Sequence, residues 1–329
     1  MICDGWRSRL PPSVIAMLPL MVAGHGSSSR LSVNASGRSS FLGVGVSVMT
    51  NSHQGGASAT AIQAHYDVSN EFYRLWLDET MTYSCAMWDN SITLEEAQVR
   101  KLDFHIDQAR ADSVARVLDI GCGWGALMRR LSARGAKEVV GLTLSSAQAG
   151  YVRDLGISGV SVAVEDWRDH SPEYPYDSLL SIGAMEHFVR PELSAAERVG
   201  VYRDFFAKCK GWLRSGQWMS LQTGAYGAGR FTHGAIASIF PESDLPRLDQ
   251  ILSAIDGQFE LVRLRSDRGD YSRTCRSWLE RMQSNRERAV GLVGEQTVRH
   301  YEAFLAASSR GFDAGVFTLL RMQLRRIGV

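Results

Sequence analysis

The 329-residue sequence has almost no excess of charge of either sign. Lysine and arginine together number 36 and aspartate and glutamate 35, so the formal net charge is +1. A protein without a strong positive field is a poor partner for a phosphate backbone, and we expect no nucleic acid ligand. The sequence also lacks an apolar run near the roughly 20 residues that a membrane-spanning helix needs, so no transmembrane segment is predicted.

Cysteines are few and form no pattern. They are scattered along the chain without a CxxC pair: Cys3, Cys85, Cys122, Cys209 and Cys275. Such spacing argues against a disulfide scaffold and against a structural zinc site, and the histidines show no metal-ligand spacing. We therefore predict no metal site and a reducing, cytoplasmic compartment.

Acidic residues are nearly absent from the start of the chain. Asp4 is the single acid before residue 60, where arginines and Ser/Gly-rich stretches dominate. A short apolar run at 14–23 vaguely resembles a signal peptide, but no clear cleavage site follows it. We interpret residues 1–48 as a disordered leader, or as upstream sequence from a misassigned start. Residues 49–329 are then one slightly acidic functional domain that begins at Met49.

From residue 61 onward, helical and strand patterns alternate. Aromatic residues at helical spacing predict a helix over 61–77, and Thr93 with Glu96 forms a capping box that opens a helix ending near Ala109. Strands are predicted at 115–120, 138–144, 160–164, 178–182 and 218–222, and helices at 126–133, 145–155 and 194–213. Alternating strands and helices form a parallel sheet covered on both faces, so the fold class is α/β.

The most informative stretch runs from Val117 to Gly125 and reads VLDIGCGWG. An apolar strand ends in Asp119, and Gly121 and Gly123 then turn the chain into the next helix. Glycines at such positions let a ligand approach the backbone, and parallel sheets bind ligands at the carboxyl ends of their strands. The loop therefore predicts a nucleotide-type cofactor.

Two cofactors compete for this loop. A dinucleotide site needs GxGxxG and an acid about 20 residues later. Here the spacing is GxGxG, and the second strand ends in Thr143 and Leu144 without an acid. Asp119 instead suits S-adenosylmethionine, and Asp166 with Trp167 after the third strand could bracket its adenine. The dehydrogenase interpretation is therefore disfavoured.

Further motifs occur in order along the chain. They are HYDVSNEFY at 65–73, YSCA at 83–86, TLEEAQ at 93–98, LDIGCGWG at 118–125, GLTLS at 141–145, SIGAMEHF at 181–188 and IFP at 239–241. From about residue 61 onward the chain thus resembles the cyclopropane-fatty-acid synthase and mycolic acid cyclopropane synthase family of S-adenosylmethionine-dependent methyltransferases. The resemblance implies a class I methyltransferase fold. This is a Rossmann-like, seven-stranded, mostly parallel sheet with an N-terminal helical cover and a lid inserted after Gln222.

The resemblance also implies the ligands of the site. Together with Asp119, the predicted cofactor-binding residues are Tyr83, Ser84, Gly121, Gly123, Thr143, Leu144, Gln148, Asp166, Trp167 and Ile182. In relatives a bicarbonate ion beside the methyl sulfonium acts as the base, and its ligands fall on the backbones of Cys85 and Ile182 and on Glu186 and Tyr271. The family's histidine ligand is replaced here by Gln222, which can donate a hydrogen bond but cannot carry a proton. Gln222 therefore puts bicarbonate binding in doubt.

Methyl transfer to a carbon–carbon double bond creates a carbocation. Its site must exclude water, stabilise cationic charge with aromatic faces and a carboxylate, and then remove a proton. Glu186 is the strongest candidate, and the predicted catalytic set is Glu186, Tyr271, Cys85, Gln222 and Tyr66. The predicted function is transfer of a methyl or methylene group to carbon of an unsaturated, apolar acceptor, a lipid or a small molecule.

Two alternatives stay open. One is a natural-product methyltransferase acting on carbon or nitrogen of a small terpenoid, polyketide or alkaloid-like acceptor. The other is a non-catalytic relative that only binds S-adenosylmethionine, which the complete cofactor motifs disfavour. Arg321, Arg325 and Arg326 are interpreted as a solvated face, His187 as structural, and His105 is given no role. The sequence does not indicate an oligomeric state.

Overall fold

The computed structural model describes residues 56–91, 93–228 and 242–328. The leader at 1–48, the start at Met49 and the IFP motif lie outside these residues, as does most of the lid expected after Gln222. The expectations for those segments stay predictions.

The described residues contain one sheet of seven strands in the order β3-β2-β1-β4-β5-β7-β6. The strands are β1 (Arg116–Ile120), β2 (Glu138–Thr143), β3 (Val160–Val164), β4 (Tyr176–Ile182), β5 (Leu213–Tyr226), β6 (Phe259–Ser266) and β7 (Phe317–Arg326). Strands β1 to β5 pair in parallel, whereas β7 runs antiparallel to both β5 and β6. The expected α/β fold with a mostly parallel, seven-stranded sheet is therefore confirmed.

Helices bury both faces of the sheet. They are α3 (Leu94–Ala109), α4 (Ala126–Ala133), α5 (Ser146–Asp154), α6 (Ala195–Trp212) and α7 (Leu248–Ile255). Consecutive residues of β1 point to opposite faces, so Val117 packs in a core with α3 and α4, whereas Leu118 packs in a core with α6 and α7. Both side chains are fully buried, as the predicted parallel sheet requires.

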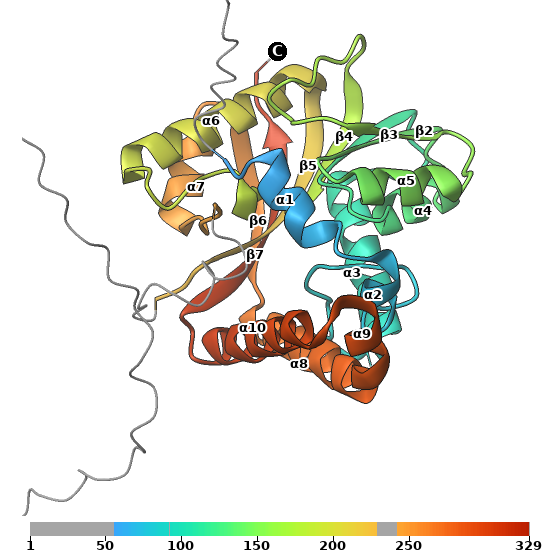
Figure 1. The fold of residues 1–329 in the computed structure, drawn as a ribbon. Helices are drawn as coiled ribbons and strands as arrows, with labels where there is room; N and C mark the ends of the chain where they lie inside the picture. The colour runs from blue at the N-terminus through green and yellow to red at the C-terminus, as the bar shows by residue number, and fades with distance from the viewer. Residues whose placement is uncertain (1–55, 92, 229–241, 329) are drawn as a thin grey trace, which may run out of the picture. The chain divides into compact units, whose positions relative to one another are not determined.

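A second group of helices lies beside the sheet, as Figure 1 shows. It comprises α1 (Ala59–Tyr66), α2 (Asn70–Arg74), α8 (Arg268–Ser284), α9 (Arg286–Val293) and α10 (Glu295–Asp313). An aromatic cluster from α2, α8 and α10 joins them, and Trp124 of the glycine loop packs into the same cluster. The helical layer therefore contacts the strand ends where a ligand would bind.

The helix expected over 61–77 is two helices. The chain leaves α1 at Asp67, and the Ser69 hydroxyl caps α2 by accepting a hydrogen bond from the Phe72 amide at 3.2 Å. The Asp67 carboxylate accepts a hydrogen bond from Ser145, at the start of α5. Short polar side chains compete with helical hydrogen bonding in this way, so the break at Asp67–Ser69 has a local cause.

Candidate active site

A cavity of about 140 Å³ lies at the carboxyl ends of β1, β2, β3 and β4. Its walls include all eleven residues that the sequence assigned to the cofactor: Tyr83, Ser84, Asp119, Gly121, Gly123, Thr143, Leu144, Gln148, Asp166, Trp167 and Ile182. We call it the cofactor cavity. Segments more than 100 residues apart in the sequence meet there, which is the arrangement expected of a ligand site on an open parallel sheet.

The glycines of the first loop adopt left-handed backbone angles. Gly121 has a φ of +81°, and a Cβ there would lie 2.5 Å from the Ala184 Cβ. Gly123 has a φ of +54° and no atom within 4 Å of such a Cβ. Gly121 is thus required by the protein's own packing, whereas Gly123 leaves open space on the cavity wall.

Unpaired polar atoms line this cavity. Asp119 is 2 % exposed, and its Oδ2 has no hydrogen-bond partner in the described part of the chain. The same holds for the Tyr83 hydroxyl and the Trp167 Nε1. Burial raises the pKa of Asp119 to about 7, although the charge of Lys101 opposes this shift. Buried polar atoms without partners are costly, so their presence here fits a polar ligand.

Polar side chains that form hydrogen bonds with one another stand at the end of β2. The Thr143 hydroxyl donates to the Gln148 Oε1 at 2.7 Å and accepts from the Ser145 amide at 3.1 Å. Ser145 in turn caps α5 by accepting from the Gln148 amide at 3.0 Å. The structure therefore brings Thr143 and Gln148 together, where a dinucleotide-binding enzyme would present an acid.

Asp166 and Trp167 lie next to each other on the cavity wall after β3, but they face different partners. The Asp166 carboxylate accepts from the Arg168 amide at 2.8 Å and from the Arg168 guanidinium at 3.0 Å. The Trp167 ring packs against Phe188 and Phe205, with the Arg168 guanidinium 4.6 Å from its centroid. That these two residues bracket an adenine stays a prediction.

Lys101 is a site residue that the sequence analysis missed. It lies on α3, is fully buried, lines the cofactor cavity, and donates a hydrogen bond to the Ser84 hydroxyl at 2.8 Å. Burial lowers its pKa to about 8. The available signal was its place on the buried side of a helix in a chain that has only four lysines.

A second cavity of about 100 Å³ adjoins the first. Tyr66, Tyr83, Gly183 and His187 line both cavities and so mark the junction. Aromatic side chains dominate the rest of the wall: Tyr271, Trp278, Phe304, Phe312 and Phe317. We call it the acceptor cavity, because a group bound there lies next to the cofactor cavity.

Glu186 lines the acceptor cavity from the 3-10 helix η1 (Met185–His187), just after β4 rather than within it. Its Oε1 accepts a hydrogen bond from the Gly224 amide at 2.6 Å, whereas its Oε2 has no partner among the described residues. Burial raises the pKa of Glu186 to about 7. One carboxylate oxygen is therefore held by the Gly224 amide, and the other is buried without a hydrogen-bond partner in the described part of the chain.

Tyr66 and His187 form a contact at the junction. The Tyr66 hydroxyl lies 3.3 Å from the His187 Nε2, and the His187 Nδ1 lies 2.8 Å from the Ser243 hydroxyl. Burial lowers the pKa of His187 to about 4, so the ring is neutral at physiological pH. His187 thus orients Tyr66, which agrees with the structural role expected for it.

Cys85 and Gln222 are close together, but neither is among the residues that line the two cavities. Gln222 is 1 % exposed, and its Nε2 donates to the Cys85 carbonyl at 3.4 Å. Its Oε1 accepts from the Arg321 Nε at 2.9 Å and lies 3.2 Å from the His105 Nε2. Burial raises the pKa of the Cys85 thiol to about 12, so it is not a thiolate nucleophile.

The expectation that Arg321 belongs to a solvated face is wrong. Arg321 is fully buried, whereas Arg325 on the same strand is exposed. Successive side chains of a strand alternate between the two faces of the sheet, so Arg321 and Arg325, four positions apart, lie on the same face. Their difference in exposure therefore depends on which segments cover each side chain. Arg321 lies against the first turn of α8 and the Cys85–Ala86 segment.

The described residues contain no group of three or more histidine, cysteine, aspartate or glutamate side chains arranged to hold a metal ion. No described helix combines the length and apolar character needed to cross a bilayer.

Comparison with known proteins gives consistent matches. The family model described as "Mycolic acid cyclopropane synthetase" matches residues 53–322. Cyclopropane mycolic acid synthase 1 of Mycobacterium tuberculosis is 32% identical over 276 residues, which cover 77% of this chain and 92% of that protein. A probable fatty acid methyltransferase of Pseudomonas putida is 33% identical over 279 residues, 82% of this chain and 69% of that protein.

Solved structures agree with these sequence matches. The cyclopropane synthase MmaA2 from Mycobacterium tuberculosis superimposes with a TM-score of 0.75 at 31% identity, covering 82% of this chain and 99% of that one. Mycolic acid cyclopropane synthase CmaA1, solved in complex with SAH and CTAB, gives a TM-score of 0.74 at 30% identity over the same shares.

Proposed function

This chain belongs to the mycolic acid cyclopropane synthetase family and is a S-adenosylmethionine-dependent methyltransferase, and from this premise we propose that it transfers a methyl or methylene group to carbon of an unsaturated, apolar acceptor. The resemblance drawn from the motifs is thereby confirmed, as is the enzyme class. One observation carries the finer proposal. Glu186, whose Oε2 has no hydrogen-bond partner among the described residues, lines an aromatic-lined cavity that meets the cofactor cavity at Tyr66 and Tyr83.

The residues of the cofactor cavity fit S-adenosylmethionine. Asp119, Tyr83 and Trp167 each have a buried polar atom without a hydrogen-bond partner in the described segments, and Gly123 leaves room for a ligand at the loop. When bound, S-adenosylmethionine supplies an electrophilic methyl group. The contribution of Lys101 is to hold the Ser84 hydroxyl in place through its hydrogen bond of 2.8 Å.

The acceptor cavity suits a reaction that develops positive charge on carbon. The faces of Tyr66, Tyr83 and Tyr271 stabilise a cation without reacting with it, and their apolar surroundings exclude water. Glu186 then accepts a proton at Oε2 while the Gly224 amide holds Oε1. With its pKa raised to about 7, the carboxylate is a stronger base than an exposed one and is still substantially ionised near neutral pH.

The contacts of Gln222 argue against the bicarbonate ion that the sequence resemblance implies. The amide nitrogen that would face such an ion donates instead to the Cys85 carbonyl, and the amide oxygen accepts from Arg321. The proposal therefore assigns proton removal to Glu186 itself. Assays in degassed, bicarbonate-free buffer should run at the same rate as assays with added bicarbonate, and a strong dependence would contradict this part of the proposal.

A second candidate, methyl transfer to carbon or nitrogen of a small natural product, rests on a different observation. The acceptor cavity measures about 100 Å³, and Ser243 and Asp244 add polar groups to its wall. Such a site suits a compact acceptor with one polar end. The CTAB complex of the relative and the fatty-acid methyltransferase name favour the lipid acceptor instead.

One experiment tests both candidates. The purified protein is incubated with S-adenosylmethionine carrying a trideuterated methyl group, either with vesicles of oleoyl phosphatidylglycerol or with a small-molecule extract, and products are analysed by mass spectrometry. A lipid product that retains two of the three deuteriums supports transfer of a methylene group, with the third lost as a deuteron, and a lipid product that retains all three supports transfer of a methyl group to carbon. A product that retains all three on a small amine supports the second candidate. Failure to label any lipid refutes the first.

A further inference from the structure

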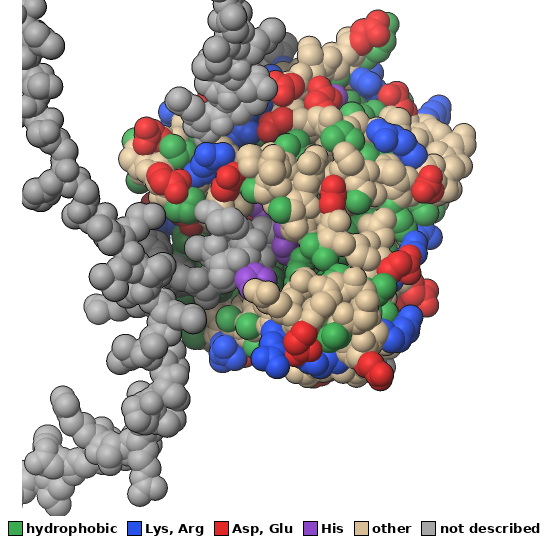
Figure 2. Space-filling model, in the orientation of Figure 1, with side chains coloured by type: hydrophobic (Ala, Val, Ile, Leu, Met, Phe, Trp, Pro, Cys, Tyr) green, Lys and Arg blue, Asp and Glu red, His purple; other side chains and the backbone are tan. Residues whose placement is uncertain are grey.

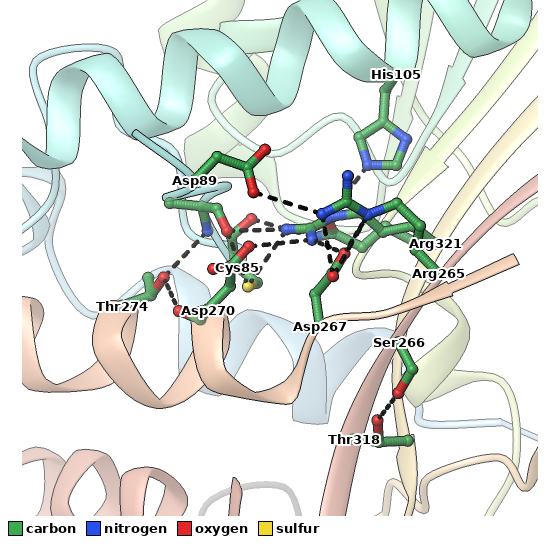
Figure 3. Close-up of polar contacts among 12 residues, drawn as sticks. Cys85, Asp89, His105, Arg265, Ser266, Asp267, Asp270, Thr274, Thr318 and Arg321 are labelled. Atoms are coloured by element: carbon green, nitrogen blue, oxygen red, sulfur yellow. Dashed lines mark hydrogen bonds and ion pairs between the residues drawn. The ribbon is translucent and has the colours of Figure 1, made fainter. Parts of the chain in front are cut away.

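Arg321 is fully buried, and its guanidinium contacts three segments of the chain. The Nε donates to the Gln222 Oε1 at 2.9 Å, and one terminal nitrogen donates to the Ala86 carbonyl at 2.8 Å. The other terminal nitrogen pairs with Asp267 and lies 3.4 Å from the Asp270 carboxylate. Figure 3 shows the guanidinium among Cys85, Asp267 and Asp270, with His105 on its other side.

Each of these three segments carries part of the site. Ala86 and Cys85 follow Tyr83 and Ser84, which line the cofactor cavity. Gln222 precedes Gly224, whose amide holds the Glu186 carboxylate. Asp267 and Asp270 open α8, and the next residue, Tyr271, lines the acceptor cavity.

The Cys85–Ala86 segment is held from two directions. The Ala86 carbonyl accepts from Arg321, and the Ala86 amide donates to the Thr274 hydroxyl at 3.2 Å. That hydroxyl donates in turn to the Asp270 carbonyl at 2.7 Å. Arg321 and α8 therefore hold the two peptide units that flank Ala86, and the position of Tyr83 relative to Tyr271 depends on both.

Stability alone does not explain why a charge is buried here. A buried ion pair must repay the loss of hydration of both partners, and its net contribution to the free energy of unfolding is often near zero. What a guanidinium offers is a rigid plane with donors in several directions, which a lysine ammonium cannot match. Arg321 uses these directions for three different segments.

We propose that Arg321 is a positioning residue for methyl transfer: without touching cofactor or acceptor, it sets the Tyr83 loop, the Gln222–Gly224 strand end and the start of α8 at the distances that the reaction needs. This proposal rests on the proposed function, because its kinetic test needs the methyl transfer. Arg321 acts only by setting the distances between these three segments. A misplacement of about 1 Å can lower a reaction rate about a hundredfold while leaving ligand affinity intact.

The test compares Arg321→Lys with Arg325→Lys, a matched change at an exposed position of the same strand. Oleoyl phosphatidylglycerol vesicles serve as the acceptor, and S-adenosylhomocysteine affinity is measured by calorimetry. We expect Arg321→Lys to lower kcat about tenfold to a hundredfold while KM for S-adenosylmethionine stays near the wild-type value. Arg325→Lys should match the wild type in every measurement. Wild-type kcat in Arg321→Lys, or a parallel loss of S-adenosylhomocysteine affinity, would overturn the proposal.

Two further measurements keep the test decisive. If Arg321→Lys does not fold, Asp267→Asn is the second variant. It removes the negative charge that pairs with Arg321 with little change of side-chain shape, and it should also lower kcat. Hydrogen exchange of the S-adenosylhomocysteine complex needs no acceptor. Faster exchange in peptides covering 82–88 and 267–274, with unchanged exchange in the glycine loop, supports the proposal for Arg321. This holds even if the vesicles are not methylated, because that result would contradict only the proposed function. Unchanged exchange in both peptides refutes the proposal for Arg321.

Discussion

At the scale of single residues, the site is made by two carboxyl groups whose surroundings raise their pKa values. Asp119 lines the cofactor cavity and Glu186 the acceptor cavity, and each has one oxygen without a hydrogen-bond partner in the described structure. Burial is the main cause of both shifts. Because the two groups stand in different cavities, substitutions at each should have separable effects on binding and on turnover.

Glu186→Gln should lower turnover by about a hundredfold or more, because the amide cannot accept the proton. Affinity for S-adenosylhomocysteine should not change, since Glu186 lines only the acceptor cavity. Turnover is followed by mass spectrometry of the deuterated product and affinity by calorimetry. The control is Glu173→Gln at an exposed position. A fully active Glu186→Gln enzyme would remove Glu186 from the mechanism.

Sequence reasoning at this scale was limited to residues inside recognisable motifs. Asp119 lies near the carboxyl end of β1 and Glu186 lies in the segment that follows β4, and ligands of parallel sheets bind at such strand ends. Arg321 and Lys101 stand in no motif, and a charged side chain on a strand or helix ordinarily indicates a solvated face. Their burial depends on Asp267, Asp270 and Ser84, partners that only the tertiary fold supplies.

At the scale of elements, the parallel half of the sheet was predictable and the antiparallel half was not. Strands β1 to β4 are short apolar runs between glycines and helices, which is the pattern of a strand buried on both faces. Strand β7 carries arginines at 321, 325 and 326, and β6 leaves Val262 and Leu264 exposed, so neither shows that pattern. The break between α1 and α2 was missed because the aromatic spacing continues through it.

The glycine loop offers a matched pair of substitutions. In Gly121→Ala the new Cβ would lie 2.5 Å from the Ala184 Cβ, so we expect a lower melting temperature and loss of S-adenosylhomocysteine binding together. In Gly123→Ala no described residue other than the two chain neighbours lies within 4 Å of the new Cβ. That variant should lose about 1 kcal/mol of stability from its left-handed backbone and still lose affinity, because its methyl group enters the cofactor cavity. Normal binding by Gly123→Ala would contradict the placement of the cofactor.

At the scale of the whole molecule, charge is mixed rather than segregated. Figure 2 shows acidic and basic side chains interspersed over the visible face, without a large area of one sign among the coloured residues. This agrees with the near balance of 36 basic and 35 acidic residues. The response of the protein to pH should therefore depend on buried groups rather than on a surface field.

The apoprotein should be most stable at about pH 5 to 6 and less stable on either side. Burial raises the pKa of Glu186 and Asp119 to about 7, so the stability that their neutral forms contribute is lost as the pH rises through 7. It lowers the pKa of His65 to about 3 and of His187 to about 4, so stability is also lost as the pH falls below their ordinary value of 6.5.

Melting temperatures across this range provide the check. Glu186→Gln should flatten the alkaline decline, by about 1 to 3 kcal/mol at about pH 8, and leave the acidic decline as it is. An alkaline decline of the same size in the variant would show that Glu186 does not titrate as its burial implies.

The position of β7 has a consequence for the synthesis of the protein. This strand lies between β5 and β6, and the Arg321 that it carries hydrogen-bonds to Gln222, 99 residues earlier. On the ribosome, β5 and β6 therefore emerge without the neighbour that joins them, and each presents an unpaired edge. The sheet can close only after translation has passed residue 326, so the nascent chain needs protection from aggregation until then. The contacts that Arg321 makes with Gln222, Ala86 and the start of α8 can therefore form only after β7 has been translated.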